Sequence, residues 1–455
     1  MTGSAVADYL PAIYHTNLNN GLTVLGVEYD RAPWLSICFM AKRGAEADPP
    51  GKGGTADCTA EGLTLGSTTR DQLRLAIDVE SRGARLEAHG NWDYSVVTLE
   101  GLAEDFGELM ALLAEVVQSP NFPEQDFAFL KGRRQAELVH LQDNPREVAN
   151  RWYYRLFFGN SPYGHPITGD LESISALTLE DLKSFYQRQF HPSESTLVVV
   201  GMVPEATVVH EADRFWSAWS GGARPAPPYQ EAPPSLGQPG IYLLDRPALT
   251  QSEIRLGHLG LPRQHPDYFA LRLANYILGG GGFSSRLMTR IRSDLGLTYG
   301  INSHFHFRRA PGPFVISTFT PASNTAAVIQ ETKVVLAELK QGGITAQELE
   351  DAKNFYIGHF PMGLESPGGI GQHLLQIDLH SLGFDYLHTY CDQMRTVQLE
   401  QVRTAAASHL HPEKLVVLVV GPAALCQSDL EALGLLTNTS TRVILSTNIC
   451  EKKDK

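Results

Sequence analysis

Residues 54–67 read Gly-Thr-Ala-Asp-Cys-Thr-Ala-Glu-Gly-Leu-Thr-Leu-Gly-Ser, and this stretch says more about the fold than any other part of the chain. Two of its residues, Asp57 and Glu61, are four positions apart, so on a helix their side chains lie on one face and can reach one ion. Carboxylate oxygens favour calcium, magnesium or manganese over zinc. The alternative is that both are ordinary polar residues on a helix that lines a cavity.

The stretch resembles the zinc-site helix of the inverted-motif zinc peptidases (inverzincins), the family of pitrilysin, insulin-degrading enzyme and mitochondrial processing peptidase. The family pattern is Gly-x-Ala-His-x-x-Glu-His, followed by apolar residues and a Gly-Ser/Thr turn. In this chain the two histidines are replaced by Asp57 and Glu61, and the catalytic glutamate by Ala60. No other His-x-x-Glu-His and no His-Glu-x-x-His occurs in the sequence. The positions that match the pattern are Gly54, Ala56, Leu63, Gly66 and Ser67.

These replacements matter because each lost residue has a chemical role. Imidazole nitrogens suit zinc, and a nearby carboxylate takes the proton from metal-bound water. Glu137 lies near the position of the family's third ligand, so a three-carboxylate site with Asp57 and Glu61 is conceivable. Ala60 cannot accept a proton, so even a bound metal would lack its base. We expect that this chain alone holds no metal, binds no stoichiometric zinc and does not hydrolyse peptides.

Composition places the chain among ordinary globular proteins. It has 455 residues, 43% hydrophobic and 19% charged, which predicts about two to four units of typical domain size. The longest apolar runs, such as 197–200 and 415–420, are too short to span a bilayer and indicate buried strands. A formal net charge of -13 without a basic cluster argues against a nucleic-acid partner.

The cysteines and the N-terminus indicate the compartment. The five cysteines are scattered without metal-type spacing, which is typical of reduced thiols. The first residues have neither a basic nor an apolar signal region, so we expect a cytoplasmic protein, or a periplasmic one if this N-terminus is a trimmed form.

The chain repeats its plan on either side of one linker. Residues 220–240 are rich in Pro and Gly, which excludes a regular helix or a central strand there. His191-Pro192, followed by a strand and Gly201, recurs as His411-Pro412, followed by a strand and Gly421. We expect duplicated domains at 1–219 and 241–455, joined by the linker at 220–240.

Hydrophobic periodicity predicts mixed elements in both halves. Predicted strands are 22–29, 35–42, 85–88, 94–102, 196–200, 254–259, 304–307, 313–319 and 415–420. Predicted helices are 70–81, 106–118, 123–141, 177–189, 268–278, 325–339 and 345–360. Alternating elements with antiparallel strand pairs favour an α+β fold.

The family resemblance covers nearly the whole chain and implies the same class of fold. It implies two homologous α+β halves, each of two sheet-and-helix units, that close like a clamshell around a peptide, as in processing peptidases. Secondary landmarks that agree are Arg43-Gly44-Ala45-Glu46, Asp143-Asn144-Pro145, Pro162-Tyr163-Gly164-x-Pro166 and Ile344-Thr345-x-x-Glu348-Leu349-x-x-Ala352-Lys353.

The second half contains a glycine run at 279–282 and, after it, Arg292 and Tyr299. A phosphate-binding loop is the weaker interpretation, because no Gly-Lys-Ser/Thr follows and the run comes after a helix. In the peptidase family this segment carries an Arg and a Tyr seven residues apart that grip the substrate backbone near the zinc. The resemblance therefore implies that Arg292 and Tyr299 bind the substrate carbonyl. The alternative is a surface arginine and the start of a strand.

Other candidates are weaker. His304 and His306 alternate on one strand and could pair on a metal, but no third ligand is near in sequence. His373 and His380 are expected to pack or to cap. Residues 87–91 occupy the place of the family's substrate-binding edge strand, although Gly90 weakens a strand there.

The functional hypothesis is a non-catalytic subunit of a heterodimeric zinc metallopeptidase. The partner would be a homologous subunit that carries His-x-x-Glu-His and the zinc, and this chain would supply Arg292 and Tyr299 to a peptide substrate. The alternative is a structural scaffold, like the core subunits of the respiratory bc complex, with no part in hydrolysis. An independent hydrolase that uses Asp57, Glu61 and Glu137 is the third possibility, and it lacks a base at Ala60.

Overall fold

The computed structural model describes residues 12–222, 225–229 and 237–433. Their helices and two β-sheets form an α+β fold, as the sequence predicts. They divide into two compact units, drawn from the described parts of 1–139, 165–229 and 358–391, and of 140–164, 230–357 and 392–455. Each unit contains one sheet, where the sequence analysis expected two sheet-and-helix units in each half. Within these residues, no helix combines the length and apolar character that crossing a bilayer requires.

The first unit is built on a six-stranded sheet in the order β1-β2-β6-β3-β5-β4. β2 and β6 are parallel and the other pairs are antiparallel. The central strands β3 and β6 are buried along almost their whole length, which agrees with their mostly apolar sequences. The bounds are β1 Ile13–Asn17, β2 Thr23–Glu28, β3 Trp34–Ala41, β4 Arg85–Gly90, β5 Ser95–Leu102 and β6 Ser195–Gly201.

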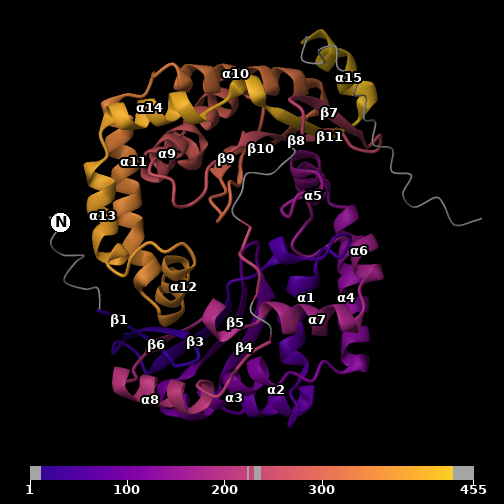
Figure 1. The fold of residues 1–455 in the computed structure, drawn as a ribbon. Coiled ribbons are helices and arrows are strands. Elements are labelled where there is room, and N and C mark those ends of the chain that lie inside the picture. Colours follow the sequence, from indigo (N-terminus) through magenta and orange to yellow (C-terminus); the bar gives the residue numbers. More distant parts are fainter. Residues whose placement is uncertain (1–11, 223–224, 230–236, 434–455) are drawn as a thin grey trace, which may run out of the picture. The chain divides into compact units, whose positions relative to one another are not determined.

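Helices of this unit come from both ends of the chain. The orange helix α12 in Figure 1, Pro367–Leu379, packs on β3 and β6. Its Asp378 pairs with Lys42 at 2.8 Å and accepts a hydrogen bond from Thr196. The other helices are α1 Thr55–Gly62, α2 Gln72–Glu80, α3 Phe106–Gln118, α4 Glu124–Gln142, α6 Leu171–Ala176, α7 Leu179–Gln189 and α8 Glu205–Trp216.

The second unit has a five-stranded sheet in the order β7-β11-β8-β10-β9. Only the β7–β11 pair is parallel among its described strands. The bounds are β7 Gly240–Asp245, β8 Gln251–Leu259, β9 Ile301–Phe305, β10 Pro313–Pro321 and β11 Val416–Gly421.

The magenta helix α5 in Figure 1, Pro145–Phe158, packs on β8 and β11 of this sheet. Asn144 caps its first turn, and Pro145 occupies the position where a missing N–H costs nothing. Asn150 of α5 accepts a hydrogen bond from Arg255 of β8 at 2.8 Å. The remaining helices are α9 Tyr268–Asn275, α10 Thr325–Lys340, α11 Ala346–His359, α14 Leu399–His409 and α15 Ala423–Ala432, with α13 Tyr386–Thr396 crossing the boundary at 391.

The two units therefore differ from the two halves of the chain, because each unit contains helices from the other half. Residues 140–164 precede the predicted linker but belong to the second unit, and 358–391 follow it but belong to the first. Parts of the linker, 223–224 and 230–236, lie outside the described residues, so the boundaries at 219 and 241 stay predictions.

Two predicted elements are shifted in the structure. The expected strand 304–307 is β9, Ile301–Phe305, because its ladder with β10 starts at Ile301. The expected helix 268–278 changes to π-helical geometry at Tyr276, three residues before the glycine run begins at Gly279.

Candidate functional site

Helix α1 begins where the sequence places a glycine in a conformation that other residues avoid. Gly54 has φ 94°, and its N–H donates to Asp48 Oδ2 at 2.8 Å. The N–H of Ala56 donates to Asp48 Oδ1 at 2.7 Å, so one carboxylate caps two of the free donors of the helix. Burial raises the pKa of Asp48 well above its usual value, although both backbone donors oppose that effect. The cap fixes the start of α1, the helix from which the side chains of Asp57 and Glu61 project.

The two carboxylates of α1 converge on a guanidinium. Arg134 of α4 places Nη2 2.8 Å from Asp57 Oδ2 and 2.9 Å from Glu61 Oε2. Its Nη1 lies 3.2 Å from Glu137 Oε2 on the next turn of α4. One arginine therefore contacts all three residues that the sequence analysis proposed as a carboxylate site. The sequence analysis missed Arg134, although its position three residues before Glu137 on a helix was a usable signal.

A second arginine adds charge at the exposed side of this cluster. Arg133 forms an ion pair with Glu61, and its Nε lies 3.8 Å from Glu137 Oε1. The Arg133 side chain is 46% exposed, whereas Arg134 is 16% exposed and Asp57 7%. Two guanidiniums thus face three carboxylates, and the most buried contact is that between Arg134 and Asp57.

Burial dominates the electrostatics of this contact. Loss of water raises the pKa of Asp57, and the Arg134 charge and a hydrogen bond from Gly90 act in the opposite direction. Burial alone would lower the pKa of Arg134, but the nearby Asp57 and Glu61 carboxylates raise it overall. Asp57 therefore depends on Arg134 to remain charged at low cost.

Zinc does not fit this arrangement. The Nη2 atom of Arg134 lies between the carboxylates of Asp57 and Glu61, where a cation bridging them would sit. The donor set has no imidazole or thiolate, which are the usual zinc ligands beside carboxylate. Ala60 is fully buried and provides no proton acceptor. The cluster can hold α1 and α4 together by charge, but it cannot activate water as the family's zinc site does.

The edge strand β4 is joined to the same helix. β4 is the last strand of its sheet, as the sequence analysis expected for residues 87–91. The N–H of Gly90 donates to Asp57 Oδ1 at 2.9 Å. A Cβ atom on Gly90 would lie 2.8 Å from the Asp57 backbone, so this close approach requires glycine.

Arg292 and Tyr299 lie close to each other on the second unit. Arg292 is in a π-helical turn, Met288–Asp294, and its Cζ lies 5.2 Å from the Tyr299 ring centroid. Phe283, which the sequence analysis did not single out, lies on the guanidinium too, at 4.5 Å. Tyr299 is 77% exposed and Phe283 70%. Two exposed aromatic rings therefore orient one arginine at the surface.

The weaker candidates find structural roles. His304 and His306 have ring centroids 6.3 Å apart, and burial lowers the pKa of His306 to about 4. His306 packs edge-on against Tyr154, which favours an aromatic contact over a metal ligand. His373 packs against Phe360. In the glycine run, a Cβ atom on Gly279 would lie 2.8 Å from the backbone of Ser303. Gly279, Gly280 and Gly281 thus serve close packing, whereas Gly282 has open space around it and a positive φ.

The cysteines agree with the prediction of reduced thiols. Four of them are free and buried, and Cys450 lies outside the described residues. The buried four are Cys38, Cys58, Cys391 and Cys426.

Comparison with known proteins gives a consistent result for both halves. A family model described as insulinase (peptidase family M16) matches residues 28–171, and one described as the peptidase M16 inactive domain matches residues 176–356. An uncharacterized zinc protease of Mycobacterium leprae is 26% identical over 413 residues, which cover 90% of this chain and 92% of the relative. One of Rickettsia bellii is 25% identical over 350 residues, covering 77% and 83%.

Solved structures agree along nearly the full length. The crystal structure of a peptidase M16 inactive domain from Pseudomonas fluorescens is 30% identical, with a TM-score of 0.84 over 90% of this chain and 98% of that one. A protease from Helicobacter pylori has the same fold, with a TM-score of 0.84 at 21% identity. The resemblance to the inverzincins is thereby confirmed, and the chain belongs to peptidase family M16.

Proposed function

We propose that this chain is the non-catalytic subunit of a heterodimeric zinc metallopeptidase. A homologous partner with His-x-x-Glu-His would carry the zinc and the general base. The observation that carries the proposal is the guanidinium of Arg134 in the place of a metal, beside an alanine in the place of the base. A chain built in this way needs a partner if it is to take part in hydrolysis.

The contribution of this chain would come from Arg292 and Tyr299. Hydrolysis by zinc-bound water develops negative charge on the scissile carbonyl oxygen. A guanidinium or phenol O–H aimed at that oxygen stabilises the tetrahedral intermediate by about 3 kcal/mol per donor. Tyr299 is exposed and Arg292 is half-buried against the two rings, so both groups lie at a surface that a substrate could approach.

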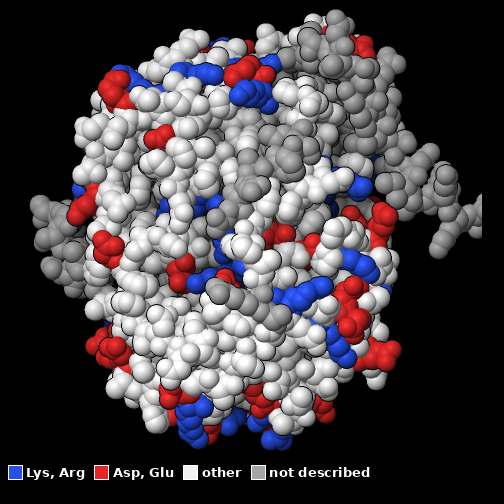
Figure 2. Space-filling view, viewed as in Figure 1, with Lys and Arg blue, Asp and Glu red and all other residues white. Residues whose placement is uncertain are grey.

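The surface supports a protein or peptide partner better than a nucleic acid. Basic and acidic side chains are interspersed on the face shown in Figure 2, and uncharged residues cover most of it. A formal net charge of -13 also argues against a polyanionic partner.

The decisive experiment measures peptide hydrolysis by this chain, by a homologue that carries His-x-x-Glu-His, and by the mixture. Zinc per chain is counted in the same samples. Activity that appears only in the mixture, with zinc on the homologue, supports the proposal. Full activity of the homologue alone would leave this chain as a scaffold or binding protein, which is the alternative function.

Variants then test the two side chains directly. We expect Arg292→Ala and Tyr299→Phe to lower kcat of the mixture by about 10- to 1,000-fold each while the two chains still associate. Arg290→Ala is the matched control, because Arg290 lies on the same turn, is 49% exposed and pairs only with Glu331 among its described ion pairs. Equal activity of all three variants would reject the role of Arg292 and Tyr299.

A further inference from the structure

A second cluster of possible metal ligands lies in the second unit, apart from the residues discussed so far. Within the described part of the chain, His265, Asp267 and His409 are the one group of three or more such side chains whose ligand atoms lie within 4.8 Å of one another. We propose that these three residues bind a divalent transition metal ion, with zinc preferred. The proposal is independent of the proposed peptidase function.

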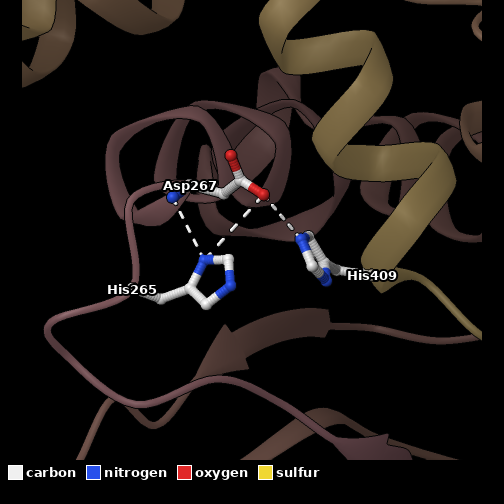
Figure 3. A group of neighbouring side chains, drawn as sticks. All are labelled: His265, Asp267 and His409. Carbon is white, nitrogen blue, oxygen red and sulfur yellow. Dashed lines mark hydrogen bonds and ion pairs between the residues drawn. The ribbon is translucent and has the colours of Figure 1, made fainter.

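The local sequence explains why these side chains meet. His265 and Asp267 lie in the segment between β8 and α9, and Asp267 is the N-cap residue of α9. His409 is the last residue of α14, and α9 and α14 pack against each other. Helix packing therefore brings together residues that are more than a hundred positions apart. Figure 3 shows both imidazole rings on the same carboxylate oxygen of Asp267.

The distances suit a metal after small movements. His409 Nε2 lies 2.7 Å and His265 Nδ1 3.8 Å from Asp267 Oδ2. Neighbouring ligand atoms around tetrahedral zinc are about 3.3 Å apart, which lies between these values. The two rings are 81° apart with centroids at 5.1 Å, so their nitrogens approach Asp267 from different directions.

The hydrogen bond of His265 is compatible with coordination. The N–H of Asp267 donates to Nδ1 of His265 at 3.1 Å, so this nitrogen is unprotonated, and an ion would take the lone pair that now accepts this hydrogen bond. The exposed fractions of the three side chains, 28%, 43% and 19%, allow an ion to enter from solvent. An ion pair joins His409 to Asp267, and the hydrogen bond from the Asp267 N–H holds His265 beside the same carboxylate.

Asp267 also borders open space at the surface. Asp267 borders a surface groove of ≈ 450 Å³ that is also lined by Phe269, Gln393 and Thr404. Two imidazoles and one carboxylate with an open position are a donor set typical of zinc and related ions. The ion would join the start of α9 to the end of α14 and would keep a water molecule or a further donor toward the groove. This site would correct the sequence-based expectation that the chain carries no metal.

The test titrates the full chain, freed of metal by a chelator, with Co²⁺ and then Zn²⁺. Visible absorption follows Co²⁺, and equilibrium dialysis counts the bound ions. We expect one ion per chain and an affinity at least tenfold weaker in His265→Ala, Asp267→Asn and His409→Ala. His409→Gln keeps an N–H donor for Asp267 and should lose affinity equally, which separates loss of a ligand from loss of folding.

Two controls locate the ion. His411→Ala removes a neighbouring imidazole that lies outside the cluster and should retain the affinity of the unchanged chain. Glu61→Gln with Glu137→Gln should also retain it, because those carboxylates belong to the degenerate site. Absence of stoichiometric Co²⁺ and Zn²⁺ binding would overturn the proposal. Unchanged affinity in a His265→Ala/His409→Ala double variant would overturn it too.

Discussion

Replacement of Arg134 by methionine should destabilise the first unit far more than the same change at its neighbour Arg133. Methionine keeps much of the side-chain volume of arginine but leaves Asp57 as a charge that is only 7% exposed. Breaking a buried ion pair on one side costs about 3–5 kcal/mol. Because Arg134 is itself 16% exposed and Gly90 still donates to Asp57, we expect about 3 kcal/mol. Arg133→Met should cost less than about 1 kcal/mol, since Arg133 is 46% exposed.

The assay is urea unfolding followed by tryptophan fluorescence. Four of the five tryptophans belong to the first unit, so the signal reports mainly on that unit. A loss of about 3 kcal/mol corresponds to a midpoint lower by about 1.5 M urea at a slope of about 2 kcal/mol/M. The four are Trp34, Trp92, Trp216 and Trp219.

The pH dependence gives a second, independent reading. Burial raises the pKa of Asp57 in the folded protein above its pKa in the unfolded chain. The contribution of Asp57 to the free energy of unfolding is therefore complete at pH values below the unfolded pKa and is lost as pH rises through the folded pKa. Without Arg134 the folded pKa rises further. The difference between Arg134→Met and the unchanged protein should therefore shrink as the pH is lowered. Adding Asp57→Asn to Arg134→Met should recover part of the loss. Equal midpoints for Arg134→Met and Arg133→Met would refute the reasoning.

Three further predictions follow from buried groups. Burial lowers the pKa of His258 to about 4. The contribution of neutral His258 to the stability of the second unit should therefore be complete above pH 6.5 and be lost as pH drops through 4. His258→Leu should weaken this acid sensitivity in a pH series of urea curves. We expect the double variant Asp57→His/Glu61→His to bind zinc at least tenfold more tightly when Arg134→Ala is added, because the guanidinium then no longer occupies the site. Equilibrium dialysis measures the affinity, and equal affinity with and without Arg134→Ala would contradict this. Burial raises the pKa of Cys58 to about 12, so a thiol reagent at pH 8 should label the described cysteines only after urea is added, these being Cys38, Cys58, Cys391 and Cys426.

The sequence predicted the regular elements well where local rules decide them. The helix expected at 106–118 is α3 with the same bounds, and Thr178 caps α7 as its sequence indicates. The unbroken apolar runs became buried strands β6 and β11. Local preference was insufficient at 268–278, where the helix becomes π-helical from Tyr276 and Gly279 lies close against Ser303 of the neighbouring strand.

The sequence by itself determined the family, the α+β class and the loss of the zinc ligands and base, because these depend on residue identity and short-range spacing. Only the tertiary structure placed Arg134 between Asp57 and Glu61, stacked Phe283 on Arg292, and brought His409 to Asp267. It alone showed that α5 and α12 pack on the sheet of the opposite half of the chain. Each of these contacts joins residues whose distance is set by the packing of helices and strands. Periodicity along the chain carries no information about such distances.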